Sequence, residues 1–258
     1  MEAVAGVVAA LLGVFLGRAL NLSIDRLPPA REDYGGRCSG RHLFRPAELA
    51  PVLMYIWWHR SCNLCRQKIP LRAAAVEGIT ALACGGLVFW YGLSLASLIL
   101  IFYAALFIHL AFVDLEHSLL LNIVVLPATP VALALFPFTP LAQDWGIVEA
   151  YLRGLAGMGV GFGMMLVIYL VTRGGTGAGD VKLAALLGAM LGFPQIVAGL
   201  ALGYILGGIA AVVLLALRIK SRKDPIPFGP ALVIGTALVV LGGAGVYSWY
   251  LNLFRFGN

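Results

Sequence analysis

Long apolar stretches dominate this chain and limit the folds open to it. Of its 258 residues, 61% are hydrophobic and 12% are charged, whereas soluble domains average about 25% charged residues. Several stretches approach or exceed the ~20 residues that cross a bilayer as a helix. We therefore predict an all-α fold, a polytopic membrane helix bundle of about eight transmembrane helices. The expected spans are residues 3–24, 73–92, 95–113, 119–136, 153–172, 181–193, 195–217 and 227–251.

The basic residues indicate how the chain is oriented in the bilayer. Half of the 18 Lys and Arg lie between Arg26 and Arg72, after the first expected span. A second basic group follows the seventh span: Arg218, Lys220, Arg222 and Lys223. Basic loops stay in the cytoplasm, so both groups are expected on that side. The net charge of +6 thus reflects topology, and we expect the lipid bilayer, not nucleic acid, as a partner.

This orientation predicts three parts in a multi-pass protein of the cytoplasmic (inner) membrane. Residues 1–24 form a first transmembrane helix, because the segment lacks a basic start and a convincing cleavage site for a signal peptide. Residues 25–72 form a small cytoplasmic subdomain, and residues 73–258 form the membrane-embedded core. The sixth span, residues 181–193, is short for a full crossing and is expected to be tilted or buried among other helices.

Two aspartates occupy positions that an apolar chain does not readily tolerate. Asp114 ends the third span and Asp180 begins the sixth. A carboxylate at the middle of a bilayer costs about 2.5–3.5 kcal/mol on insertion scales, so an intramembrane aspartate is by default a functional residue. The predicted orientation brings both to the cytoplasmic side at the same depth. Two carboxylates that share one proton can activate water against an amide bond.

The second aspartate follows a glycine-rich segment, GTGAGDVK. Gly177 and Gly179 have no side chains, so a substrate backbone or another helix can approach closely. Asp180 is expected in the first turn of its helix, where the helix dipole favours the anionic form, whereas Asp114 at a helix C-terminus experiences the opposite bias. These environments push the two pKa values apart, which provides one ionised and one protonated carboxyl for acid–base hydrolysis.

Other interpretations of the two aspartates are open at this point. Asp180 can be a plain N-cap residue, and Asp114 can be a residue that has emerged into solvent. A protein of another class, a transporter or proton-coupled channel, would use Asp114 and Asp180 as ion-binding groups. Proteolysis needs the two carboxylates close together near the cytoplasmic face, whereas transport expects a midplane site reached from both sides.

Four segments resemble a known family in their order along the chain. FVDLEHSLLLNIVVLP followed by GTGAGDVKLAALLGAMLG resembles the type IV prepilin peptidases, membrane aspartyl proteases of the GxGD type. Asp114 matches the first aspartate of that family, although Leu121 replaces the proline of the following turn. GVFLGRALNLSIDRLP resembles the exit of the family's first helix, and PIPFGPALVIG its last span. The second motif matches fully, at Gly177, Gly179, Asp180 and Lys182.

The resemblance implies an activity and a substrate class. Members cleave the short basic leader of type IV prepilins and pseudopilins at the cytoplasmic membrane face, usually after a glycine. Asp114 and Asp180 would be catalytic, with Gly177 and Gly179 in support. Lys182 would hold the ionised aspartate or steer the acidic group of a mature pilin; snorkelling to the interface is the alternative. Many members then methylate the new N-terminus with S-adenosylmethionine.

The expected cytoplasmic subdomain departs from the family at its cysteines. The family typically has two Cys-x-x-Cys pairs there, and this chain keeps only the second, Cys62 and Cys65. With Cys38 and His42 they form a three-thiolate, one-imidazole set suited to structural zinc, which would fold a loop too small for its own core. The alternative is a degenerate, metal-free loop. The missing pair leaves methyltransferase activity an open question.

Overall fold

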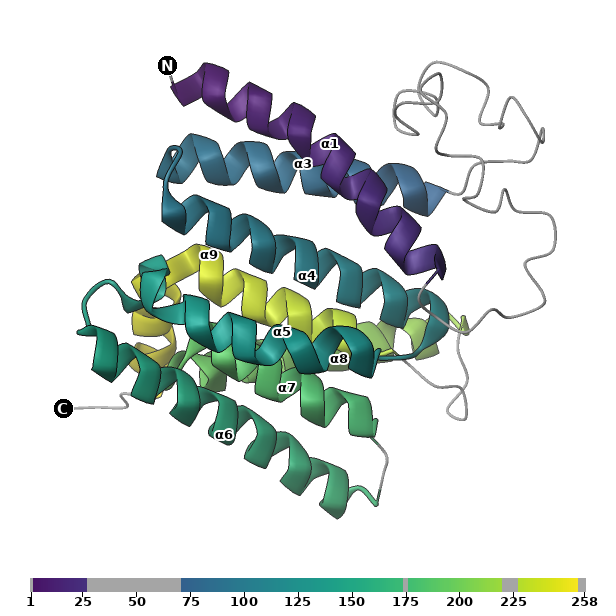
Figure 1. Ribbon diagram of the computed structural model, residues 1–258. Helices are drawn as coiled ribbons and strands as arrows, with labels where there is room; N and C mark the ends of the chain where they lie inside the picture. Colours follow the sequence, from purple (N-terminus) through teal and green to yellow (C-terminus); the bar gives the residue numbers. More distant parts are fainter. Residues whose placement is uncertain (1, 27–70, 174–175, 220–226, 255–258) are drawn as a thin grey trace, which may run out of the picture. The chain divides into compact units, whose positions relative to one another are not determined.

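The computed structural model describes residues 2–26, 71–173, 176–219 and 227–254, with side chains placed as far as residue 242. Most of the expected cytoplasmic subdomain, residues 25–72, lies outside these ranges. Within them all regular structure is helical (Figure 1). The α-helices are α1 (Glu2–Arg26), α3 (Leu71–Tyr91), α4 (Leu95–His117), α5 (Asn122–Leu135), α6 (Ile147–Val171), α7 (Ala178–Leu191), α8 (Gln195–Ala216) and α9 (Gly229–Phe254), with short 3-10 turns η3 (Phe136–Phe138) and η4 (Pro140–Ala142) between α5 and α6.

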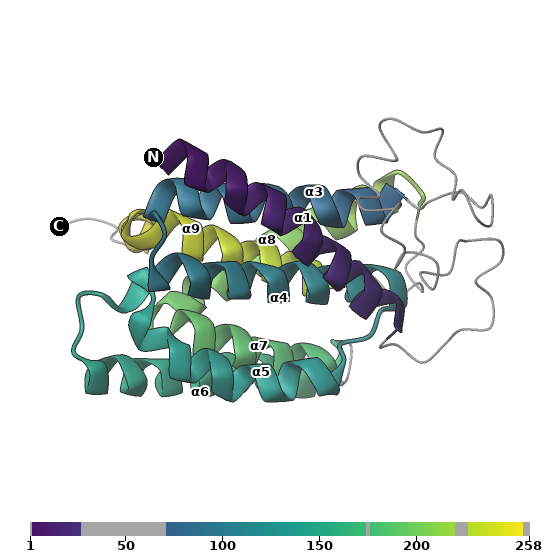
Figure 2. The same cartoon turned by 45° about the horizontal axis from the view of Figure 1, so that its top comes forward.

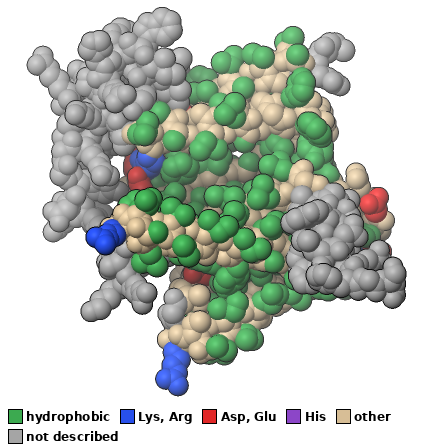
Figure 3. Space-filling view, turned by 180° about the vertical axis from the view of Figure 1, so that it is seen from behind, with side chains coloured by type: hydrophobic (Ala, Val, Ile, Leu, Met, Phe, Trp, Pro, Cys, Tyr) green, Lys and Arg blue, Asp and Glu red, His purple; other side chains and the backbone are tan. Residues whose placement is uncertain are grey.

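The described α-helices correspond in order to the eight predicted spans, which confirms the all-α membrane fold. Five of them, α1, α3, α4, α6 and α8, are long and apolar enough to cross a membrane. Large apolar side chains are exposed on these helices, such as Leu82 and Trp90, and Figure 3 shows a face covered mainly by hydrophobic side chains. Such a surface suits lipid, so the chain is a multi-pass membrane protein.

Two predicted boundaries are wrong by more than a turn: α4 continues to His117, four residues past the predicted end at residue 113, and the start of α6 differs more. Helix α6 begins at Ile147, whereas the sequence pattern predicted residue 153. Glu149 and Arg153 form a hydrogen-bonded ion pair at 2.9 Å in the first turns of α6. A glutamate near a helix N-terminus and an arginine four residues later both stabilise a helix. Glu149 and Arg153 interrupt the apolar pattern of the sequence, but they belong to the helix.

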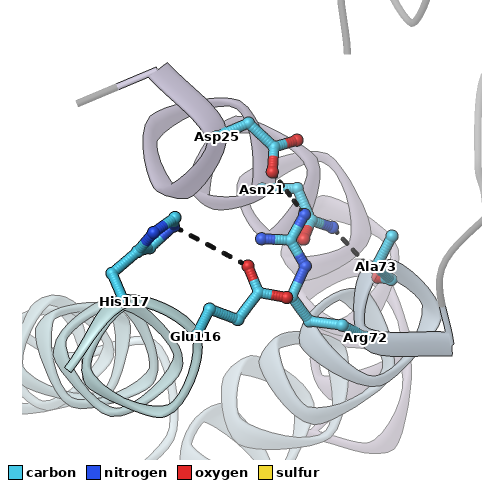
Figure 4. Close-up of polar contacts among 6 residues, drawn as sticks. All are labelled: Asn21, Asp25, Arg72, Ala73, Glu116 and His117. Carbon is cyan, nitrogen blue, oxygen red and sulfur yellow. Dashed lines mark hydrogen bonds and ion pairs between the residues drawn. The ribbon is translucent and has the colours of Figure 1, made fainter. Parts of the chain in front are cut away.

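The chain divides into two compact units, Met1–Phe112 and Val113–Asn258. In the first unit α1 lies against α3. The Asn21 amide donates a 2.9 Å hydrogen bond to the Ala73 carbonyl, and the Arg72 guanidinium pairs with Asp25 (Figure 4). These contacts hold the C-terminal end of α1 against the N-terminal end of α3.

Helix α7 is the centre of the second unit, where α6 and α5 pack against it (Figures 1 and 2). It has 14 residues, about 21 Å of helix against a hydrocarbon core of about 30 Å. Ten of them are buried: Asp180, Val181, Leu183, Ala184, Leu186, Leu187, Gly188, Ala189, Met190 and Leu191. A helix that is buried on every face lies among other helices and away from lipid, which confirms that expectation for the short sixth span.

Glycines set how closely α7 approaches its neighbours. A Cβ on Gly188 would collide with the carbonyl oxygen of Gly157 on α6. Small residues allow this close packing of membrane helices. Helix α7 ends at Leu191, and the next residue, Gly192, has a φ of 69°, a left-handed conformation that favours glycine. The Phe136 ring fills the space where a side chain at residue 192 would lie.

Candidate active site

Asp180 lies in the first turn of α7 and is 7% exposed. Its Oδ2 accepts a 3.1 Å hydrogen bond from the backbone N–H of Gly177. Gly177 is the N-cap of α7 and Asp180 is the third residue of the helix. The simple N-cap interpretation of Asp180 is therefore wrong, although its carboxylate does satisfy one of the free N–H groups at this helix start.

Asp114 lies in the last turn of α4 and is 6% exposed, so it has not emerged into solvent. Its Oδ2 accepts a 3.0 Å hydrogen bond from the backbone N–H of Gly229. Gly229 is the first residue of α9, and the first N–H groups of a helix have no partner within that helix. Asp114 thus lies in the last turn of one helix and caps the start of another, where a negative charge is favoured.

The two carboxylates interact electrostatically. Asp180 belongs to α7, which is not one of the five helices that are long and apolar enough to cross a membrane. Burial raises its pKa, the negative charge of Asp114 raises it further, and the hydrogen bond from Gly177 lowers it, with a net pKa of about 6. The expected bias of the helix N-terminus toward the anion is present but is outweighed by desolvation and like charge. The prediction that the helix dipole keeps Asp180 in its anionic form was therefore wrong.

The two sequence motifs are also in direct contact. A Cβ on Gly179 would lie 2.9 Å from the Cβ of Leu120, in the turn after α4. The close approach expected at Gly179 is therefore made by this chain itself. Lys182 provides a second link, because its Nζ donates a 2.9 Å hydrogen bond to Oδ1 of Asn122, the first residue of α5. Lys182 is thus directed to Asn122 and does not hold the Asp180 carboxylate.

Gly229 and its neighbour Phe228 were missed by the sequence analysis. The segment Pro-Phe-Gly-Pro before an apolar run is a signal for a helix start. The segment does not reveal that the N–H group at this helix start donates to Asp114, which lies 115 residues earlier. Tyr204, whose ring contacts Phe228, was missed as well, because it lies in an apolar helix that has no polar pattern.

Replacing Gly229 by alanine is expected to impair the site. A Cβ there would lie 2.7 Å from Oδ2 of Asp114, so the carboxylate must move and its hydrogen bond is lost. A hydrogen bond to a charged group contributes about 1.5–3 kcal/mol, so we expect kcat to fall about 10- to 100-fold. Steady-state kinetics of peptide cleavage measures this change. Gly163→Ala is the control, because nothing lies within 4 Å of a Cβ there; an unchanged kcat in Gly229→Ala would contradict the assigned contact.

The expected metal ligands Cys38, His42, Cys62 and Cys65 lie outside the described residues. Within the described ranges no group of three or more His, Cys, Asp or Glu side chains is arranged to hold a metal ion. Cys84, on α3, is a buried free cysteine.

A bundle of membrane helices that buries two interacting carboxylates, each hydrogen-bonded at a helix start, has the groups needed for aspartyl peptide hydrolysis. Comparisons with known proteins define the class further. Residues 100–212 match the model of the type IV leader peptidase family, and residues 11–91 match that of the bacterial peptidase A24 N-terminal domain.

Curated relatives extend this similarity to nearly the whole chain. The chain is 30% identical to a prepilin leader peptidase/N-methyltransferase of Pseudomonas putida, over 96% of this chain and 94% of that protein. It is 28% identical to the protein of that name in Bacillus subtilis, over 83% of each chain. The chain belongs to the type IV leader peptidase family. No solved structure matches it. Membership of a peptidase family favours an enzyme over the transporter that two carboxylates also allow.

Proposed function

We propose that this protein is a membrane aspartyl endopeptidase that removes the short basic leader of type IV prepilins or pseudopilins at the cytoplasmic face of the inner membrane. Asp114 and Asp180 are its catalytic pair. The observation that supports the pair is the influence of one buried carboxylate on the other, since the charge of Asp114 contributes to the raised pKa of Asp180. The names of the relatives support the substrate class.

The surroundings of the two carboxylates suggest a role for each. Both carboxylates accept an N–H at a helix start, and we assign the negative charge to Asp114 because its charge raises the pKa of Asp180. Asp180, with its pKa raised to about 6, is the member that holds the shared proton. One ionised and one protonated carboxyl is the combination that aspartic proteases use.

In the proposed reaction, Asp114 takes a proton from water as the water oxygen attacks the scissile carbonyl carbon. Asp180 gives its proton to the carbonyl oxygen, so the tetrahedral intermediate is neutral. When the C–N bond breaks, Asp114 passes its proton to the departing amine and Asp180 takes a proton back from the oxygen. The pair thus returns to its starting state, and no other acid or base is needed.

Lys182 is proposed to interact with the substrate. It is partly buried and lies two residues after Asp180 in the first turns of α7. Its contact with Asn122 is a single hydrogen bond, which a carboxylate can replace with a stronger, charge-assisted one. We therefore propose that Lys182 steers the acidic group found early in mature pilins.

The proposed function is tested by incubating the purified full-length protein in detergent with a prepilin and measuring product masses. Loss of the leader alone supports the peptidase. Detergent micelles hold no ion gradient, so cleavage in them also separates the peptidase from the transporter hypothesis. An intact prepilin, with a protein that is folded, would contradict the proposal. A parallel incubation with S-adenosylmethionine asks whether the product gains one methyl group; we assign no residue of this chain to that donor.

We also propose a structural zinc ion bound by Cys38, His42, Cys62 and Cys65. The proposal depends on donor chemistry alone, since three thiolates and one imidazole are an accepted zinc set. Metal analysis of the purified protein is expected to find about one zinc per chain. Cys62→Ser is expected to lose it, and Cys84→Ser, at a buried cysteine in α3, to keep it. A metal-free wild-type protein would contradict this proposal.

A further inference from the structure

Phe228 is fixed at two points beside the Asp114 site. Its carbonyl oxygen accepts hydrogen bonds from Ala231 at 3.1 Å and Leu232 at 3.2 Å, so its backbone starts α9. Its ring packs on Tyr204 of α8, with ring centroids 4.9 Å apart and an interplanar angle of 52°, a geometry typical of favourable aromatic pairs. The peptide N–H of Gly229 follows directly after these two attachments, so its direction depends on both.

The Phe228 ring also lies directly on the backbone of α8 at Gly207. A Cβ at Gly207 would collide with Cε2 of the ring and would be 2.9 Å from Cδ2. One turn earlier on the same face, a Cβ on Gly203 would lie 2.9 Å from the Cα of Leu232 on α9. The backbones of α8 and α9 therefore approach closely at Gly203, and at Gly207 the ring of Phe228 lies on α8.

Tyr204 is itself held on its other side. Its hydroxyl donates a 2.9 Å hydrogen bond to Sδ of Met165 on α6. A thioether is a weak acceptor, so this bond orients the ring more than it stabilises the fold. Tyr204 thus contacts α6 through its hydroxyl and α9 through its ring.

We propose that Tyr204 and Gly207 are positioning residues of the peptidase: they seat the Phe228 ring and so aim the Gly229 N–H at the Asp114 carboxylate. The inference depends on the catalytic role proposed for Asp114. A catalytic group displaced by about 1 Å loses on the order of 10²-fold in rate, because the reacting atoms are no longer aligned. Disturbing the contacts of the Phe228 ring with Tyr204 and Gly207 is therefore expected to lower kcat and to leave KM nearly unchanged.

The test compares matched variants of the full-length protein on one prepilin. Gly207→Ala is expected to lower kcat about 10-fold or more, with KM and melting temperature close to wild type. Gly208→Ala, the next residue on α8, has open space at its Cβ and is expected to match wild type. Equal kcat in both alanine variants would overturn the proposal. So would an activity of Gly207→Ala that falls only in proportion to the fraction of protein that is folded.

A second pair of variants keeps the test decisive if Gly207→Ala does not fold. Tyr204→Leu removes the ring and is expected to lower kcat, whereas Tyr204→Phe keeps the ring and is expected to recover most of that loss. Equal losses in both would assign the effect to the hydroxyl and overturn the seating role. Asp114→Asn is assayed alongside. If it cleaves normally, the proposed function itself has failed. If it is inactive while the Tyr204 and Gly207 variants are normal, only the positioning role has failed.

Discussion

Replacing either Asp114 or Asp180 by asparagine is expected to abolish leader cleavage and to leave the protein folded. The Oδ1 of asparagine can accept the same hydrogen bonds that the carboxylates now accept from Gly229 and Gly177. An amide, however, neither takes nor gives up a proton near neutral pH. General acid or base catalysis contributes up to about 10⁴-fold, so we expect each variant to lose on the order of 10³-fold or more in rate.

The control for these variants is Asp144→Asn, the same substitution at an exposed carboxylate before α6. It is expected to cleave at the wild-type rate. Because the two aspartates are proposed to act as one catalytic unit, the double variant should be little slower than either single variant. Full processing by Asp114→Asn or Asp180→Asn would contradict the catalytic pair. The measurement is the cleaved fraction of prepilin over time.

The second large effect is expected on stability, from Gly188→Ala. A Cβ at Gly188 collides with the Gly157 carbonyl oxygen, and both atoms belong to helix backbones that cannot rotate away. Helices α6 and α7 must therefore separate. Overpacking of this kind costs about 1–3 kcal/mol, so a lower melting temperature in detergent is expected. Because α7 also positions Asp180, cleavage by the protein that remains folded should be slower.

The matched control is Gly159→Ala on α6, where nothing lies within 4 Å of a Cβ. Alanine has a higher helix propensity than glycine by about 1 kcal/mol, so this variant should be as stable as wild type or slightly more stable. A melting temperature for Gly188→Ala equal to that of Gly159→Ala would contradict the close crossing of α6 and α7.

Much of the architecture could be predicted because the bilayer restricts what an apolar chain can form. The eight helices follow from the apolar stretches, and the basic loops placed Asp114 and Asp180 at the same end of the bundle. Helix ends were less predictable. The start of α6 includes Glu149 and Arg153, whose mutual pairing is invisible to a measure of hydropathy.

The surroundings of the proposed catalytic pair could not be predicted from local sequence. Gly229 contacts the Asp114 carboxylate because of where α4 and the start of α9 lie, and such contacts between distant helices leave no periodic signal. The ionisation of Asp180 is a similar case. The sequence showed a helix N-terminus, which favours the anion, but not the burial or the neighbouring charge that outweigh it.

The proton that the two aspartates are proposed to share can be followed directly, without a substrate. Infrared titration of protein containing ¹³C-labelled aspartate follows each carboxyl group, and the band lost in Asp180→Asn identifies Asp180. In the wild-type protein Asp180 is expected to titrate with a pKa of about 6. In Asp114→Asn its pKa should be lower, because removing a neighbouring negative charge favours ionisation. A pKa of Asp180 that is the same in both proteins would show that the two carboxylates do not form a pair.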